Sequence, residues 1–143
     1  MALGLLWAIL AAVATNIGVG MLWYGPLFGG PWMRSMNMEN ISEAEMEQMR
    51  EEAMPGYFIS MASAALATAL LWFLFDWASA MPDAYAPWLK GLVLGFTAWL
   101  GFYVGPSLTT EFYESKRFVA WAIGAGYWGV TAMLYGVYVG VFH

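Results

Sequence analysis

The charged residues of this chain are confined to three windows, and the rest of the sequence divides into four apolar stretches. No Asp, Glu, Lys or Arg occurs in these stretches, which are residues 1–33, 53–75, 91–110 and 118–142. The shortest has 20 residues, and about 20 helical residues cross the hydrocarbon core of a bilayer. The pattern therefore predicts four membrane-spanning helices, at about residues 3–24, 56–77, 88–110 and 118–142.

Small residues recur within the predicted spans at helical spacing. The first two spans each place them on one ridge, Gly4, Ala8, Ala12, Asn16 and Gly20 in one and Gly56, Ser60, Ala64 and Thr68 in the other. Lipid gives helices no hydrophobic reason to associate, so close packing over small residues must hold them together. The fourth span has small residues on several faces, which predicts a central position or an oligomer.

The segment between the first two spans predicts a short additional helix. Ser42 and Glu45 form a capping box, in which each residue bonds the backbone of the other at a helix start. An amphipathic helix at about residues 43–53 should follow and pack on the end of the bundle.

Pro106 should kink the third span, because its missing N–H frees the carbonyl of Phe102. Nearby hydroxyls are the expected partners of this carbonyl. The predicted fold is all-α, a four-helix transmembrane bundle with this short helix in its first loop, as one domain over residues 1–143.

Composition agrees with a membrane protein and excludes several functions. Hydrophobic residues make up 62% and charged residues 10%, against roughly 45–50% and about 25% in soluble domains. The absence of cysteine excludes disulfides, thiol nucleophiles and Cys-ligated metals. The net charge of −5 comes with no basic patch, so nucleic acid is not an expected partner.

Three further patterns concern topology and internal organisation. Four of the five basic residues lie in the first and third loops, Arg34, Arg50, Lys116 and Arg117, which places these loops in the cytoplasm and both termini outside. The first 14 residues resemble a signal peptide but lack its basic start, so we expect a retained span. An aromatic–Gly–Pro segment ends both the first and third spans, which raises the hypothesis of an internal repeat.

The chain resembles a family of small prokaryotic membrane proteins known only as domain of unknown function 1761. The resemblance rests on G-M-L-W-Y-G-P-L-F-G-G-P-W at residues 20–32, K-G-L-V-L-G-F at 90–96, G-F-x-x-G-P at 101–106, F-Y-E-S-K-R-F at 112–118 and A-G-Y at 125–127. It implies a four-helix fold in the prokaryotic cytoplasmic membrane and supplies no activity or catalytic residue.

Polar and aromatic residues converge at the end of the bundle where the first and third spans finish. The candidate pocket consists of Asn16, Trp23, Tyr24, Trp32, Tyr103, Ser107, Thr110, Glu111 and Arg117. It could hold a small solute, a lipid headgroup or a partner helix. The alternative interpretation is a structural cap, in which a basic side chain (Arg34, Lys116 or Arg117) neutralises Glu111 and Asn16 forms an interhelical hydrogen bond.

These residues favour a non-enzymatic membrane component that self-associates or serves as an accessory subunit of a membrane complex. The alternative is a small oligomeric transporter or channel lined by Asn16, Thr68 and residues 107–111. A weaker hypothesis is Cu(I) binding by the thioethers of Met33, Met36 and Met38. We expect no catalytic residue and no cofactor. We do expect bound lipid or detergent.

Overall fold

Every regular element of the described residues is helical. The computed structural model describes residues 2–38, 40–78, 85–111 and 117–143. Its elements are α1 (Ala2–Leu22), η1 (Trp23–Leu27, a π-turn), α2 (Gly29–Ser35), α3 (Glu43–Ala78), α4 (Pro87–Trp99), η2 (Leu100–Val104, a second π-turn), α5 (Gly105–Thr110) and α6 (Phe118–Phe142). Four helical segments are long and apolar enough to cross a membrane, Leu3–Leu27, Glu43–Phe75, Pro87–Thr110 and Phe118–Phe142. The prediction of an all-α membrane bundle is confirmed, and the chain is an integral membrane protein.

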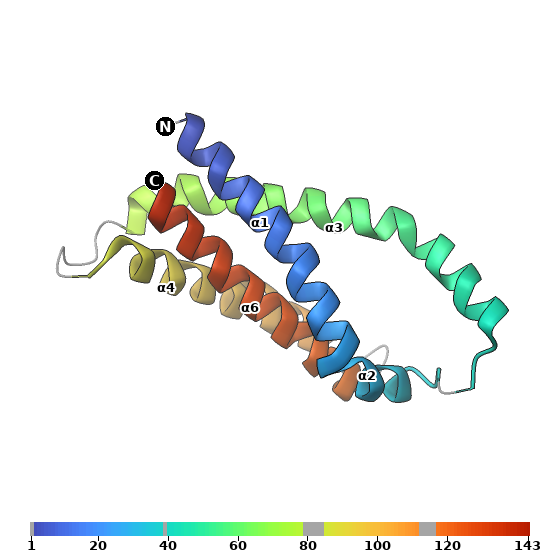
Figure 1. The fold of residues 1–143 in the computed structure, drawn as a ribbon. Coiled ribbons are helices and arrows are strands. Elements are labelled where there is room, and N and C mark those ends of the chain that lie inside the picture. The colour runs from blue at the N-terminus through green and yellow to red at the C-terminus, as the bar shows by residue number, and fades with distance from the viewer. Residues whose placement is uncertain (1, 39, 79–84, 112–116) are drawn as a thin grey trace.

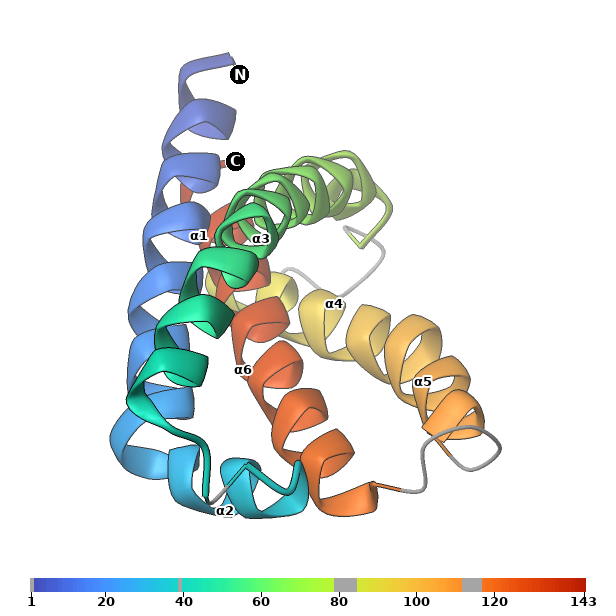
Figure 2. The ribbon, with the colours of Figure 1, turned by 90° about the vertical axis from the view of Figure 1, so that its right-hand side faces the viewer.

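The four long segments alternate in direction, and α6 is the central helix. Figure 1 shows both chain ends at one end of the bundle, with α2 and the start of α6 at the other, which we name the α2 end. Helix α6 contacts α1, α2, α3 and α4. Toward the α2 end, α4 and α5 diverge from α1 and α2, with α6 between them (Figure 2). Small residues on several faces of α6 therefore reflect its central place.

Helices α4 and α6 pack with their backbones in contact. A Cβ atom built on Gly91 would overlap the carbonyl oxygen of Gly136, and one on Gly95 would overlap that of Ala132. Only glycine permits this approach, which replaces side-chain packing by close backbone contact. The predicted small-residue seam is thus used within the chain.

The other predicted ridges also face the interior, except at Gly56, the first residue of the second ridge, which is exposed. Ala8, Ala12 and Asn16 of α1 are buried, as are Ala64, Thr68 and Trp72 of α3. Together with Leu71, Tyr135 and Val139, the apolar members of these ridges form the hydrophobic core.

The expected separate loop helix is wrong, because α3 runs without a break from Glu43 to Ala78. It begins where the capping box predicts, but it continues through Pro55 instead of ending at about residue 53. The proline removes a hydrogen bond to the carbonyl of Glu51, and this carbonyl lies in an exposed segment where water can bond it.

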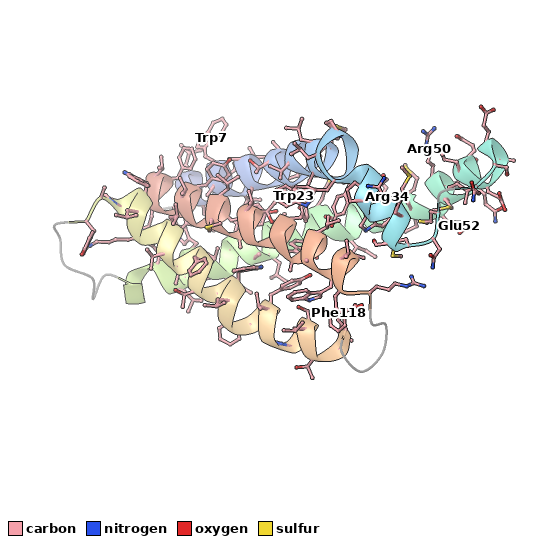
Figure 3. The ribbon with its side chains drawn as sticks, turned by 90° about the horizontal axis from the view of Figure 1, so that it is seen from below. Trp7, Trp23, Arg34, Arg50, Glu52 and Phe118 are labelled. Atoms are coloured by element: carbon pink, nitrogen blue, oxygen red, sulfur yellow. The ribbon has the colours of Figure 1, made fainter. Side chains whose placement is uncertain are left out.

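The first half of α3 also does not pack on the bundle as expected. Residues 43–59 are exposed except for the half-buried Met49. The whole helix is about 54 Å long at 1.5 Å per residue, well beyond the ~30 Å hydrocarbon core. Figure 3 shows Arg50 and Glu52 beyond the level of Arg34 and Phe118. The charged turns of α3 therefore form an arm that leaves the membrane.

The two aromatic–Gly–Pro segments coincide with the two π-turns. In η1, Gly25 leaves the helical conformation (φ −98°, ψ −108°), and the chain turns into α2, a helix that the sequence did not predict. At Pro106 the backbone stays helical, and the preceding π-turn η2 takes the place of the expected kink. The order helix, π-turn, helix occurs at both places, in keeping with the repeat hypothesis.

Candidate functional site

Asn16 is the centre of a buried hydrogen-bonded group that joins three helices. Its Nδ2 donates to Oγ of Ser60 on α3 at 2.8 Å. Its Oδ1 accepts from the hydroxyls of Tyr127 at 2.6 Å and Tyr135 at 3.0 Å, both on α6. The Tyr127 hydroxyl also lies 3.0 Å from the main-chain oxygen of Asn16. Asn16 is only 4% exposed, so this group, the Asn16 network, occupies the interior of the bundle.

Other polar side chains of the interior are also bonded within the protein. The Thr15 hydroxyl pairs with that of Tyr138 at 2.6 Å. Thr68 donates to the carbonyl of Ala64 at 2.8 Å. Within the described part of the chain, no buried side-chain nitrogen or oxygen lacks a hydrogen-bond partner. The Thr15–Tyr138 pair joins α1 to α6, whereas Thr68 bonds its own helix.

Between the Asn16 network and the α2 end, each π-turn brings one tyrosine to α6. Tyr24 of η1 lies between Trp32 of α2 and Tyr127, with ring centroids 5.8 and 5.5 Å away. Tyr127 contacts Trp128 at 5.2 Å, and Trp128 contacts Tyr103 of η2 at 6.3 Å. We name Tyr24, Tyr103 and Tyr127 the tyrosine cluster. The structure thus brings together Asn16, Tyr24, Trp32 and Tyr103 of the candidate pocket.

Two hydroxyls of the tyrosine cluster have no hydrogen bond to any described residue, those of Tyr24 and Tyr103. The Tyr24 hydroxyl lies beside Gly124 of α6, and its ring contacts that of Tyr127. Helix α3 does not cover this level, because a Cβ on Gly56, one turn before Ser60, would meet no atom within 4 Å. Tyr24 is 38% exposed and Tyr103 is half-buried, and their unbonded hydroxyls are candidates for binding a ligand.

Tryptophans bind both diverging sides of the bundle to α6. Trp23 donates from Nε1 to the carbonyl of Ile123 at 2.9 Å, and Trp99 donates to that of Ala125 at the same distance. Trp121 donates to Oγ of Ser107 at 3.1 Å. The predicted residues Trp23 and Ser107 therefore have structural roles on either side of α6.

The hydroxyls near Pro106 do not bond the carbonyl of Phe102 as expected. Ser107, Thr109 and Thr110 donate to the carbonyls of Val104, Gly105 and Pro106. Helical geometry accounts for this, because a hydroxyl reaches a carbonyl three or four residues back most directly. Thr110 is exposed and takes no part in the tyrosine cluster.

The expected ion pair of Glu111 with Arg34 or Arg117 is not formed. Oε1 of Glu111 instead accepts the main-chain N–H of Arg117, which satisfies an otherwise unpaired donor where α6 begins. Lys116, the third expected partner, lies outside the described residues. Arg50 and Glu47, both in α3, form an ion pair at 3.3 Å.

The three methionines of the copper hypothesis lie at the end of α2. Nη1 of Arg117 contacts Sδ of Met36 at 3.5 Å. A cation bound to this sulfur would meet the positive guanidinium first. The hypothesis therefore gains no support from Met36.

The sequence interpretation missed Ser60, Tyr127 and Tyr135 as partners of Asn16. Ser60 was on the predicted small-residue ridge, and Tyr127 closes the A-G-Y segment. Neither pattern says which helix faces Asn16, because that depends on how α6 is placed between α1 and α3.

Comparison with known proteins yields one match. A family described as "Protein of unknown function (DUF1761)" matches residues 7–140. No curated protein and no solved structure matches the chain.

Proposed function

The chain belongs to the DUF1761 family, and we propose that it is a non-catalytic component of the prokaryotic cytoplasmic membrane that works as a self-associated bundle. In this proposal the α2 end faces the cytoplasm, where the positive-inside rule places Arg34, Arg50 and Arg117. Both termini then lie outside.

The observation that carries the proposal is an outward row of small residues on the third span. Thr97, Gly101, Gly105 and Thr109 follow one another every four residues and are all exposed. A Cβ on either glycine would meet no atom within 4 Å, in contrast to Gly91 and Gly95 of the same span. The hydroxyls of Thr97 and Thr109 bond their own helix, so the row presents a smooth, small surface.

A second copy of the chain is the partner that this surface fits. Rows of small residues associate parallel helices by close backbone approach. Two copies in one membrane orientation, related by a two-fold axis along the membrane normal, would place identical rows against each other. The seam between the antiparallel helices α4 and α6 shows the same close backbone approach within the chain.

The interior contacts favour this role over transport. Asn16 and Thr68, expected to line a path, are 4% and 0% exposed. Their hydrogen bonds go to protein groups, so lining a path would require breaking the Asn16 network.

Self-association can be measured by energy transfer between labelled copies in dilute lipid vesicles. We expect Gly101→Leu and Gly105→Leu to weaken dimerisation, because each side chain keeps the backbones apart. Gly18→Leu is the matched control, since Gly18 is an exposed glycine of α1 with no atom within 4 Å of its Cβ.

Two results would overturn the proposal. One is a parent protein that stays monomeric at high protein-to-lipid ratio. The other is a loss of dimerisation in Gly18→Leu with none in Gly101→Leu or Gly105→Leu, which would assign the contact to α1. Solute flux through vesicles that hold the parent would favour the transport alternative.

A further inference from the structure

Two arginines at the α2 end form no ion pair with a carboxylate of the described residues. Arg34 lies in the last turn of α2, and Arg117 immediately precedes α6. Both are exposed. Arg117 contacts the sulfur of Met36, while Glu111 bonds the main chain of Arg117 and not its guanidinium.

The two arginines belong to one junction of the fold. Helix α2 contacts α6, and Met36, which touches Arg117, is two residues after Arg34. The carbonyl of Arg34 accepts the N–H of Asn37 at 3.0 Å, so the chain turns back at this point. The junction closes the α2 end of two membrane-spanning segments, which is where lipid headgroups lie.

Deeper in the membrane, the same end holds the two unbonded phenols. The Tyr24 hydroxyl lies beside Gly124, seven residues after Arg117 and therefore about 10 Å further along α6. Tyr103 belongs to the same cluster through the ring contacts of Trp128 and Tyr127. A tyrosine hydroxyl donates to carbonyl oxygens, and the neighbouring Trp32 and Trp128 are of the type that lies at the membrane interface.

We propose that the α2 end binds one anionic phospholipid. The phosphate lies at Arg34 and Arg117, and the ester oxygens accept hydrogen bonds from Tyr24 and Tyr103. The order of the groups matches the order of a phospholipid, charge outside and ester carbonyls deeper. A free phosphate ion would use the arginines and leave the tyrosines unbonded.

Charge selects the headgroup. The unpaired guanidiniums favour a net negative headgroup over a zwitterionic one, whose ammonium group would lie against them. The acidic arm of α3 does not compensate them, since its carboxylates form no ion pair with either arginine among the described residues. A basic residue at the membrane surface adds about fivefold to the affinity for an anionic lipid.

The test is native mass spectrometry of the detergent-purified full chain, titrated with phosphatidylglycerol, phosphatidylcholine or glycerol 3-phosphate. We expect phosphatidylglycerol to bind most tightly. Arg34→Gln and Arg117→Gln should each weaken it about fivefold, and together about 25-fold. Arg50→Gln is the matched control, because Arg50 is an exposed arginine of the same end that already pairs with Glu47. Tyr24→Phe and Tyr103→Phe should weaken both phospholipids alike, since both carry ester carbonyls.

Three results would overturn the inference. The first is equal binding of the two phospholipids, and the second is a loss of phosphatidylglycerol binding in Arg50→Gln as large as in Arg117→Gln. The third is competition by glycerol 3-phosphate at the concentration at which the lipid binds, which would indicate a site for the phosphate alone. Melting temperatures of the single arginine variants, measured without added lipid, should equal that of the parent, so that lost binding is not lost folding.

Discussion

Replacement of Asn16 by alanine should destabilise the bundle by about 2 kcal/mol. The side chain makes three hydrogen bonds, one to Ser60 and one each to Tyr127 and Tyr135. Hydrogen bonds between membrane helices contribute about 0.6 kcal/mol each on average, and three of them give about 1.8 kcal/mol. The loss of these hydrogen bonds should weaken the packing of α1, α3 and α6 together, because the network joins all three helices.

The same residues allow a stricter test of the reasoning by a double-mutant cycle. Tyr135→Phe removes one of the three bonds and should cost about 0.6 kcal/mol. Asn16→Ala already removes the bond to Tyr135. The double variant should therefore be destabilised by about 0.6 kcal/mol less than the sum of the two single variants. Reversible unfolding in mixed micelles of mild and denaturing detergent gives the free energies.

The control for this cycle is Gly18→Ala on the outer face of α1. Its added methyl group has no atom within 4 Å, so the free energy of unfolding should stay within about 0.5 kcal/mol of the parent. An Asn16→Ala variant as stable as this control would refute the assigned role of the network. Additive costs of Asn16→Ala and Tyr135→Phe would show that the two side chains are not bonded to each other.

Three further changes test other parts of the fold. Gly136→Leu should destabilise the bundle by about 1–3 kcal/mol or more in the same unfolding assay, because the new side chain would overlap the backbone of α4 at Gly91. Pro55→Ala should slow hydrogen exchange in the arm of α3 by restoring the missing hydrogen bond, and unchanged exchange there would contradict a continuous helix. Hydrogen bonds from Ser42 lower the pKa of Glu45, a residue of the exposed arm. The cap should therefore be complete above the ordinary pKa of a glutamate and be lost as the pH falls through the lowered value. Lower protection factors at residues 43–46 on acidification, absent in Glu45→Gln, whose side chain does not titrate, would report this loss.

The sequence pattern determined that the chain folds in a membrane, the number of its membrane spans and most of the faces that pack. A charge in hydrocarbon is so costly that it must be excluded from the spans, so charge placement along the chain revealed the four spans. Small residues at every fourth position follow from the helical repeat, so the buried faces at Ala8, Ala12, Ala64 and Thr68 could be predicted without coordinates.

Only the tertiary structure decided which groups meet. The sequence pointed to Asn16, Tyr24 and Tyr103, but their meeting through Tyr127 and Trp128 depends on the rotation of α6 between its neighbours. The continuity of α3 through Pro55 is also a tertiary result, because a proline can be accommodated where water reaches the carbonyl it frees. Hydrogen bonds and charges depend on the three-dimensional neighbours of each group, and for this reason Glu111 could be placed at the correct end of the bundle while its partner was predicted wrongly.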